Sequence, residues 1–225
     1  MKIMGIGAHY DDCIFGIPGI LLRAVDQGHE VTVLSIIGNY KNWSPVGTTR
    51  QEDMIAGTTR LFEEKGITLK FLNHQSMNIE VNQTSKKAVA EAVAKVEPDV
   101  GFLLWPHDSH PDHEAVSQLS KIAFNWAGTV LGASKSVRRP KRLYYYDNGP
   151  RHTLGFEPDT FIDMGDYATP AIDWLATVMS FVVGPQSSLG VVESKKTLAA
   201  YRGKACGVSS AEAVKSFQNY PVDIF

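Results

Sequence analysis

Short apolar runs alternate with amphipathic stretches along the first 130 residues of the chain. The stretches between the runs have helical periodicity, at about 12–27, in a segment ending near Lys65, at Ser85–Val96 and at His113–Ala127. The runs themselves are rich in β-branched and aliphatic residues, which is typical of strands buried on both faces. They are Ile3–Ala8, Glu30–Ile37, Leu69–Leu72 and Val100–Trp105. This alternation predicts a Rossmann-like α/β fold, with a mostly parallel sheet and helices on both faces.

The second half of the chain has a less regular pattern, punctuated by prolines. We expect two short strands and three helices there: strands at Arg142–Tyr146 and Thr160–Ile162, and helices at Thr169–Val183, Glu193–Ala205 and Ser209–Phe217. We find no internal repeat and no linker long enough to split the chain. Residues 1–225 are therefore expected to form a single domain, with a Rossmann-like core at 1–130 and a substrate-side extension at 131–225.

Composition narrows the class of protein. The chain has 225 residues, 44% of them hydrophobic, and a formal net charge of -2, so we expect a globular protein that does not bind nucleic acid. It has no apolar run of about 18 residues, so we expect no membrane association. The N-terminal MKIMGIGAHYDD reaches two carboxylates before an apolar region develops, so we expect no signal peptide. Cys13 and Cys206 match no metal or redox spacing, and a reduced, cytoplasmic protein is expected.

Two clusters of polar residues follow two of the predicted strands. Ala8–Asp12 (AHYDD) comes directly after the first strand, and His107–His113 (HDSHPDH) comes directly after the fourth. Each cluster opens a predicted helix. In an open α/β sheet, ligands bind beyond the carboxyl ends of the strands, so the fold itself is expected to bring the clusters together.

The residue types in these clusters suit a catalytic zinc site. Such a site has three protein ligands and keeps one position open for water. His9 and Asp12, three residues apart on a tight turn, can converge on one point, and His113 can supply the third ligand. A metal held there lowers the pKa of its bound water and polarises a substrate carbonyl.

The remaining residues of the clusters fit supporting roles. Asp11 lies beside Asp12 but is expected to point differently, which makes it the candidate general base. His110, one turn from His113, is placed either to stabilise an oxyanion or to protonate a leaving amine. Asp112 is expected to hold an imidazole in its correct tautomer.

Each feature on its own also has an ordinary structural explanation. Asp11–Asp12 could be a helix N-cap, His9 a structural histidine, and His110–His113 a capped loop. Gly5-Ile6-Gly7 invites a dinucleotide-binding interpretation, but Tyr10 stands where that motif needs glycine. The two clusters occur together at the ends of strands of one predicted sheet, and this favours a metal site over these separate explanations.

The motifs also resemble those of a known family. AHYDDCIFG resembles the AHPDDExxG signature, and HPDHEA resembles the HPDHxA signature, of the LmbE-like (PIG-L) N-acetylglucosaminyl deacetylases. The likeness extends to an R-x-E element at Arg50, to Phe156–Asp163 and to Gly203–Ala213. The resemblance implies an LmbE-like deacetylase fold and a catalytic zinc. By position it also implies the same roles for the site residues, with His9, Asp12 and His113 as ligands, Asp11 as base and His110 as its electrostatic or acid partner.

The chain departs from the family pattern in several places. Tyr10 replaces the usual proline and Cys13 the usual glutamate, and we expect Cys13 to be a buried helix residue. Ser76 falls near an aspartate that binds a sugar hydroxyl in the family, and the usual lysine and His-x-Ser-Gln elements are not recognisable in Ala168–Val183. The substrate end of the pocket is therefore expected to be altered. Arg50 and Ser76 are the candidate substrate-binding residues, and loop 38–48 is a candidate lid.

The sequence thus predicts a zinc-dependent hydrolase that removes an N-acetyl or related N-acyl group from an amino sugar or glycoside-like small molecule. Three alternatives stay open: an amidase for a different small-molecule conjugate, a non-catalytic metal-binding module, and an Fe(II) oxygenase using two histidines and one carboxylate. Accordingly, Fe²⁺ or another divalent metal could replace Zn²⁺. A homo-oligomer is also compatible with the sequence.

Overall fold

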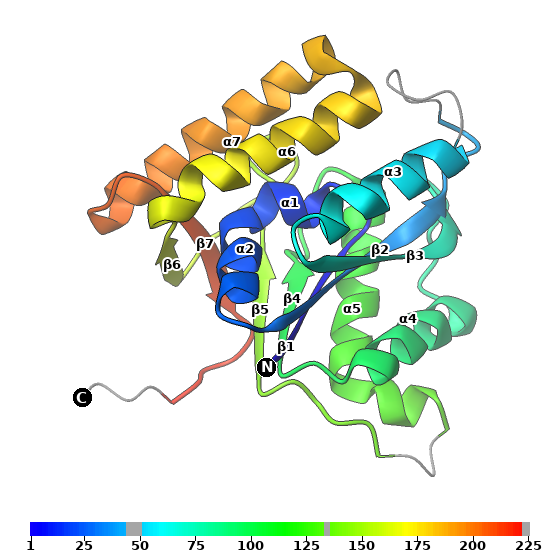
Figure 1. The fold of residues 1–225 in the computed structure, drawn as a ribbon. Helices are drawn as coiled ribbons and strands as arrows, with labels where there is room; N and C mark the ends of the chain where they lie inside the picture. The colour runs from blue at the N-terminus through cyan, green and yellow to red at the C-terminus, as the bar shows by residue number, and fades with distance from the viewer. Residues whose placement is uncertain (44–50, 133–135, 222–225) are drawn as a thin grey trace.

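The computed structural model describes residues 1–43, 51–132 and 136–221, which form a single sheet flanked by helices (Figure 1). The sheet has seven strands in the order β3-β2-β1-β4-β5-β7-β6. The first five strands are parallel, and β7 pairs antiparallel with both of its neighbours. Their bounds are β1 Lys2–Gly7, β2 Glu30–Asn39, β3 Ile67–Gln75, β4 Val100–Leu104, β5 Arg142–Tyr146, β6 Thr160–Asp163 and β7 Ala211–Ser216.

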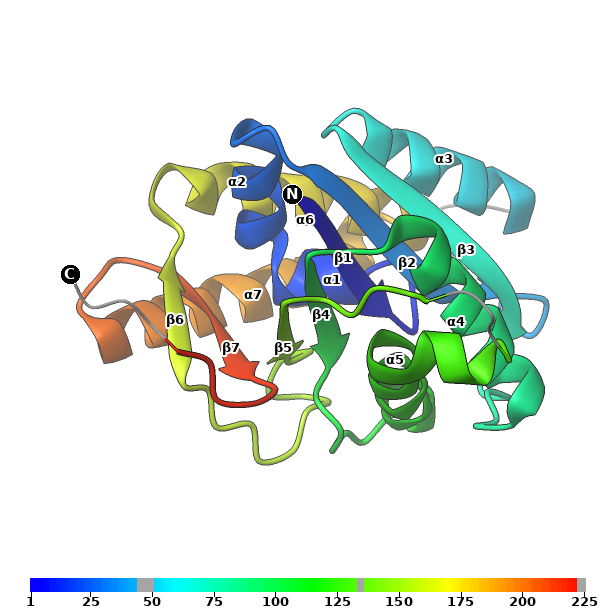
Figure 2. The ribbon, with the colours of Figure 1, turned by 90° about the horizontal axis from the view of Figure 1, so that it is seen from below.

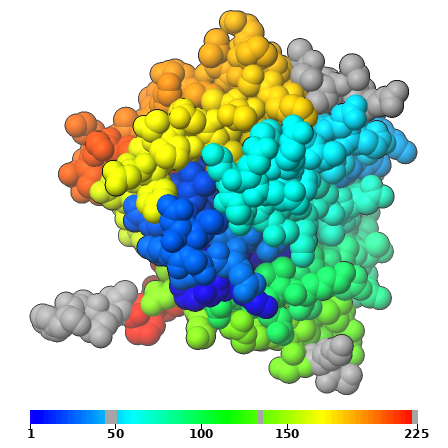
Figure 3. All heavy atoms as spheres, in the orientation of Figure 1, coloured from blue at the N-terminus to red at the C-terminus, as the bar shows by residue number. Residues whose placement is uncertain are grey.

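Helices cover the two faces of this sheet. Besides a 3-10 turn at Gly165–Tyr167, seven α-helices are described: α1 Asp12–Gly16, α2 Pro18–Asp26, α3 Gln51–Glu63, α4 Gln83–Val96, α5 Pro111–Val130, α6 Ala168–Val183 and α7 Pro185–Cys206. Helices α4 and α5 lie together on one face, and α1, α2, α3 and α6 lie on the other (Figure 2). The yellow atoms of α6 lie against α2 and α3, and the orange atoms of α7 lie beyond α6 (Figure 3). Within the described residues, no helix has the length and apolar character needed to cross a membrane.

The strand order creates a crevice at the centre of the sheet. The chain runs outward from β1 through β2 to β3, then returns to place β4 on the other side of β1. At this reversal, the segments following β1 and β4 diverge to opposite faces, which leaves space between them. The two polar clusters follow these two strands.

The predicted Rossmann-like fold is confirmed, and most predicted elements lie within a few residues of the observed ones. Two predictions were wrong in detail. The stretch expected as one helix to about Gln27 is two helices, because Pro18 has no N–H to continue α1 and instead begins α2. Ser209–Phe217, expected as a helix, contains the strand β7. The division of the chain near residue 130 stays a prediction.

Strand β7 is determined by its surroundings rather than by its own composition. Its sequence AEAVKS favours a helix locally, but its first four residues are buried between β5 and β6. Glu212 in this strand is fully buried and accepts hydrogen bonds from the Gly19 and Ile20 N–H groups, each at 2.8 Å. Its carboxylate also pairs at 3.1 Å with the buried Lys195 Nζ of α7. Glu212 therefore joins α2, α7 and the sheet.

We expect Glu212→Ala to destabilise the protein by about 3–5 kcal/mol, because it leaves a buried ammonium without its counter-charge. Urea unfolding measures the change. Glu193→Ala is the matched control, since Glu193 pairs at 3.7 Å with Lys196 on the exposed surface of α7, where such pairs contribute about 0–1 kcal/mol. Equal unfolding free energies for the two variants would contradict the role given to Glu212.

Candidate metal centre and active site

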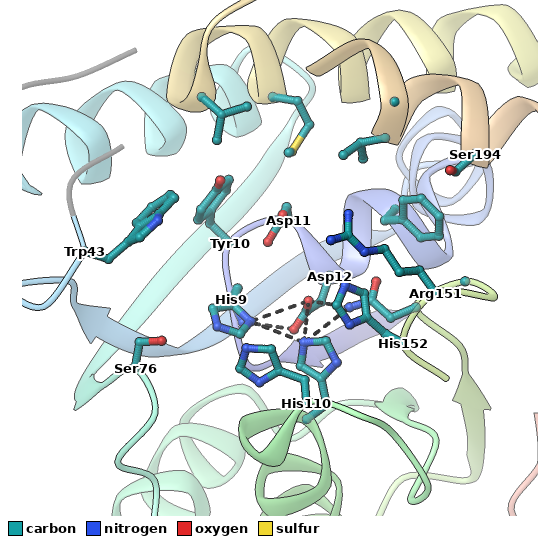
Figure 4. A pocket seen from close by; sticks show the side chains of 18 of the residues that line it. His9, Tyr10, Asp11, Asp12, Trp43, Ser76, His110, Arg151, His152 and Ser194 are labelled. Atoms are coloured by element: carbon teal, nitrogen blue, oxygen red, sulfur yellow. Dashed lines mark hydrogen bonds and ion pairs between the residues drawn. The ribbon is translucent and has the colours of Figure 1, made fainter. Parts of the chain in front are cut away.

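A cavity of about 490 Å³ opens beyond the carboxyl ends of the parallel strands. Segments following all five parallel strands contribute to it, and helices α6 and α7 supply a further wall (Figure 4). The described lining residues are His9, Tyr10, Asp11, Asp12, Phe15, Tyr40, Asn42, Trp43, Ser76, Met77, His110, His113, Asn148, Gly149, Pro150, Arg151, His152, Met179, Val183, Gly190, Val191 and Ser194. Both predicted clusters therefore meet in one cavity.

Three side chains of the clusters converge on a single point. The His9 Nδ1 atom lies 3.3 Å from His113 Nε2 and 3.8 Å from Asp12 Oδ1, and the His113 Nε2 and Asp12 Oδ1 atoms are 3.4 Å apart. Ligands bonded to one tetrahedral zinc at about 2.0–2.2 Å are about 3.3–3.6 Å from each other. The two separations that involve His113 fall within this range and the His9–Asp12 separation lies just beyond it, so the predicted ligand set is close to the spacing of such a site.

The Asp12 side chain is fixed by the turn in which it lies. Its Oδ2 accepts hydrogen bonds from the backbone N–H groups of Ala8 (2.6 Å) and His9 (2.9 Å). This leaves Oδ1 directed at the two imidazoles. Gly7 makes the arrangement possible, since a Cβ at this position would lie 2.8 Å from the Asp12 Cβ. The glycine-rich end of β1 thus serves close packing of a carboxylate.

Each histidine of the triad has a carboxylate behind it. Asp108 Oδ1 lies 3.1 Å from His113 Nδ1, on the side of the ring away from the triad. Asp112 Oδ2 lies 3.7 Å from His9 Nε2 and accepts a hydrogen bond from the Met77 N–H at 2.7 Å. Carboxylates in these positions orient metal-binding imidazoles and raise their basicity. The role expected of Asp112 stays a prediction, and no such role was expected of Asp108 from the sequence.

The electrostatic environment of the triad favours a cation. Burial opposes protonation of His113, yet the carboxylates of Asp12 and Asp108 raise its pKa to about 10. Burial would likewise raise the pKa of Asp12, but His113 and His9 hold it well below its usual range. The centre of the triad is thus a place where positive charge is strongly stabilised. A divalent ion fits this donor set.

Asp11 points away from the triad's donor atoms and lines the cavity (Figure 4). It is the N-cap residue of α1, but its side chain makes no capping hydrogen bond. Burial, together with the neighbouring Asp12, raises its pKa to about 6. A carboxylate that lines the cavity and has this pKa suits a general base.

His110 lines the cavity, and one of its ring nitrogens is engaged by the backbone. It is the N-cap residue of α5, and its Nδ1 accepts a hydrogen bond from the Asp112 N–H at 3.2 Å. Burial and the neighbouring His113 and His9 lower its pKa. A neutral ring that accepts at Nδ1 carries its proton on Nε2. This tautomer favours hydrogen-bond donation to an oxyanion over the alternative role of acid.

The segment following β5 contributes residues that the sequence analysis missed. Asn148 Nδ2 donates to Asp12 Oδ1 at 2.6 Å and lies 3.5 Å from His113 Nε2. Arg151 and His152 line the cavity beside it. The sequence contains a signal for these residues, because Asp147–His152 (DNGPRH) directly follows the predicted strand Arg142–Tyr146. The other two clusters follow their strands in the same way.

The remaining expectations have mixed outcomes. Ser76 lines the cavity, where its Oγ donates to Asp112 Oδ2 at 3.3 Å. Arg50 lies outside the described residues, as do positions 44–48 of the candidate lid. Positions 38 and 39 of that loop belong to the end of β2, and positions 40–43 follow it, with Trp43 at the cavity. Cys13 is buried in α1, as expected, with its Sγ 3.3 Å from the Tyr146 hydroxyl.

Comparison with known proteins bears on this site. The family model described as GlcNAc-PI de-N-acetylase, PIG-L, matches residues 4–124, more than half of the chain. The diacetylchitobiose deacetylase of Thermococcus kodakarensis is 24% identical over 237 residues, covering 95% of this chain and 82% of that protein.

Two solved structures show the extent of the fold similarity. The conserved protein TT1542 of Thermus thermophilus superposes with a TM-score of 0.82 at 24% identity, over 99% of this chain and 97% of that one. The 4-carboxy-2-hydroxymuconate hydratase GalB of Pseudomonas putida KT2440 superposes with a TM-score of 0.80 at 14% identity, over 100% and 99% of the two chains.

The family match includes both clusters, from β1 through most of α5. The resemblance drawn from AHYDD and HPDH is therefore confirmed, and with it the prediction of a deacetylase. The individual roles of the site residues stay predictions. The chain belongs to the PIG-L family of de-N-acetylases.

Proposed function

We propose that this protein is a zinc-dependent hydrolase that removes an N-acetyl group from an amino sugar or a glycoside built on one. One observation carries the proposal: the His9, Asp12 and His113 donor atoms lie 3.3–3.8 Å apart in a cavity that Asp11 and His110 also line. Two imidazoles and one carboxylate are a ligand set used by catalytic zinc. Zinc bound there would polarise the amide carbonyl and lower the pKa of a water molecule at its open position.

The reaction adds water across the amide and releases acetate and an amine. Asp11 accepts a proton from the attacking water and returns it to the departing nitrogen. His110 donates a hydrogen bond from Nε2 to the carbonyl oxygen as negative charge develops there. Asn148 orients the Asp12 carboxylate through its 2.6 Å hydrogen bond. Amide hydrolysis needs Asp11, a carboxylate that does not belong to the triad. An Fe(II) oxygenase would not need it.

The walls of the cavity suit a sugar ring. Trp43 and Tyr40 offer aromatic surface, with ring centroids 5.7 Å apart, and Asn42 and Ser76 offer hydrogen-bonding groups. The volume of about 490 Å³ lies within the usual range for small-molecule sites, roughly 300–1,000 Å³. The name of the Thermococcus relative, a diacetylchitobiose deacetylase, supports an N-acetylated amino sugar as substrate.

The fold alone does not determine the reaction, because a hydratase has a similar fold over the whole length of this chain. Hydration of a double bond and hydrolysis of an amide both add water with the help of a base. The family match supports the amide here. The products separate the two reactions, since only hydrolysis releases an amine.

The direct test is an amine-release assay of the zinc-loaded protein with N-acetylglucosamine, diacetylchitobiose and their glycosides. We expect release of one amine per acetate, abolished by a chelator and restored by Zn²⁺. Metal analysis of the purified protein should give one ion per chain. Absence of amine release from the whole panel by the zinc-loaded protein would overturn the proposal.

Asp11→Asn should reduce kcat by roughly 10²–10⁴-fold, the usual contribution of a positioned general base, because the amide cannot accept the proton. Metal content should stay at the level of the unaltered protein, since Asp12 rather than Asp11 faces the imidazoles. Steady-state kinetics and metal analysis on the same preparation measure both quantities. Loss of the metal would instead make Asp11 a ligand and reverse the assignment of the two aspartates.

Asp108→Asn should weaken zinc affinity by roughly 10–100-fold, because the amide no longer supports His113 with a negative charge. Competition with a chromogenic chelator measures the affinity. Asp166→Asn makes the same chemical change at an exposed residue that does not line the cavity and should leave the affinity unchanged. Unaltered affinity in Asp108→Asn would show that this carboxylate does not act on the metal.

A further inference from the structure

Arg151 differs from the other arginines in the described part of the chain. Each of the other six has a hydrogen-bond, ion-pair or cation–π partner: Arg23 with Asp163 and Tyr167, Arg60 with Glu64, Arg138 with Asp99, Arg139 with Trp126, Arg142 with Tyr144 and Tyr220, and Arg202 with Asp147. Among the described residues, no acceptor, carboxylate or ring partners Arg151. Its side chain extends from the segment after β5 into the cavity, over His152 (Figure 4).

The backbone that carries Arg151 is tightly held. The N–H groups of His152 and Thr153 donate to Gly149 O at 3.2 and 3.0 Å, and the Asn148 N–H donates to Thr153 Oγ1 at 2.8 Å. The Ser109 N–H donates to His152 O at 2.8 Å, which ties the segment to the second cluster. A fixed backbone lowers the conformational entropy that the Arg151 side chain would lose on binding a ligand.

The charged side chains of the cavity are unevenly placed. Its described lining contains two carboxylates, on Asp11 and Asp12, and one guanidinium, on Arg151. The carboxylates of Asp108 and Asp112 lie behind the imidazoles of the triad, so negative charge is concentrated around the triad. A neutral amino sugar would leave the Arg151 guanidinium without a counter-charge among the described residues.

We propose that the substrate carries a carboxylate in addition to its N-acyl group, and that Arg151 binds this carboxylate. The inference rests on the proposed function and narrows its substrate class to acidic N-acyl amino sugars and related conjugates. A guanidinium binds a carboxylate through two parallel N–H···O bonds. A phosphate dianion would need further positive charge, and the other residues beside Arg151 are neutral ones such as Asn148, His152 and Ser194.

A binding experiment on the zinc-loaded Asp11→Asn variant tests this, because the ligands then stay intact. Calorimetry would compare four ligands: N-acetylglucosamine, N-acetylglucosaminuronic acid, N-acetylglucosamine 6-phosphate and N-acetylmuramic acid. We expect at least one carboxylate to bind about tenfold or more tighter than the neutral sugar and the phosphate, a typical gain for a charge-assisted hydrogen-bonded pair.

Adding Arg151→Met should abolish this preference and leave the affinity for the neutral sugar unchanged. Arg60→Met is the matched control, since Arg60 is exposed on α3 and does not line the cavity. It should keep the preference in full. No preference for either carboxylate, a preference for the phosphate, or a preference that survives Arg151→Met would each overturn the inference.

The result separates this inference from the proposed function. Amine release from neutral sugars without any carboxylate preference supports the hydrolase and rejects the role of Arg151. If a carboxylate binds through Arg151 but the protein with Asp11 intact releases no amine, the anion site is supported and the hydrolase is rejected.

Discussion

The site depends on the carboxylate of Asp12, because both of its oxygens accept hydrogen bonds. Its Oδ2 is held by two N–H groups of the turn after β1, while its Oδ1 accepts from Asn148 beyond β5 and faces His113 on α5. These contacts of Asp12 bring three segments that are far apart in sequence to the same point. Because Oδ2 is satisfied by backbone that cannot move without disturbing β1, the position of Oδ1 is fixed before any metal binds. A donor that is preorganised in this way loses little conformational entropy on binding an ion.

Buried charge elsewhere holds the second half of the chain against this centre. Arg202 of α7 pairs with Asp147, the residue before Asn148, and both side chains are almost fully buried. Lys195, also on α7, pairs with Glu212, whose carboxylate in turn accepts the first N–H groups of α2. Helix α7 is therefore anchored at one place to the β5 segment that reaches the metal centre and at another to the helices that follow β1. The wall that α7 gives to the cavity is set by these ion pairs.

The sequence predicted the parts of the site that local chemistry determines. His9, Asp12 and His113 could be identified because two motifs follow strands whose order brings their carboxyl ends together. Asp108 could not be distinguished from Asp112, since only the path of the loop decides which carboxylate backs which imidazole. Strand β7 was missed because AEAVKS has helical propensity and becomes a strand only between β5 and β6. The wall residues of α6 and α7, such as Met179 and Val191, carry no signal beyond apolar character.

The triad and one wall of the cavity come from different parts of the chain, so that wall can change while the triad stays the same. The triad and its carboxylates lie on the turns after β1 and β4, all within the segment that matches the family model. Arg151, His152 and the faces of α6 and α7 lie beyond residue 124, outside that match. A change in the walls contributed by α6 and α7 alters which molecule fits the cavity and leaves the Asp12 hydrogen bonds to Ala8, His9 and Asn148 in place. Of the departures from the family pattern, Ser76 lies within the matched segment and Ala168–Val183, the helix α6, lies beyond it. Neither contributes a donor atom to the triad, and both border the cavity, through Ser76, Met179 and Val183.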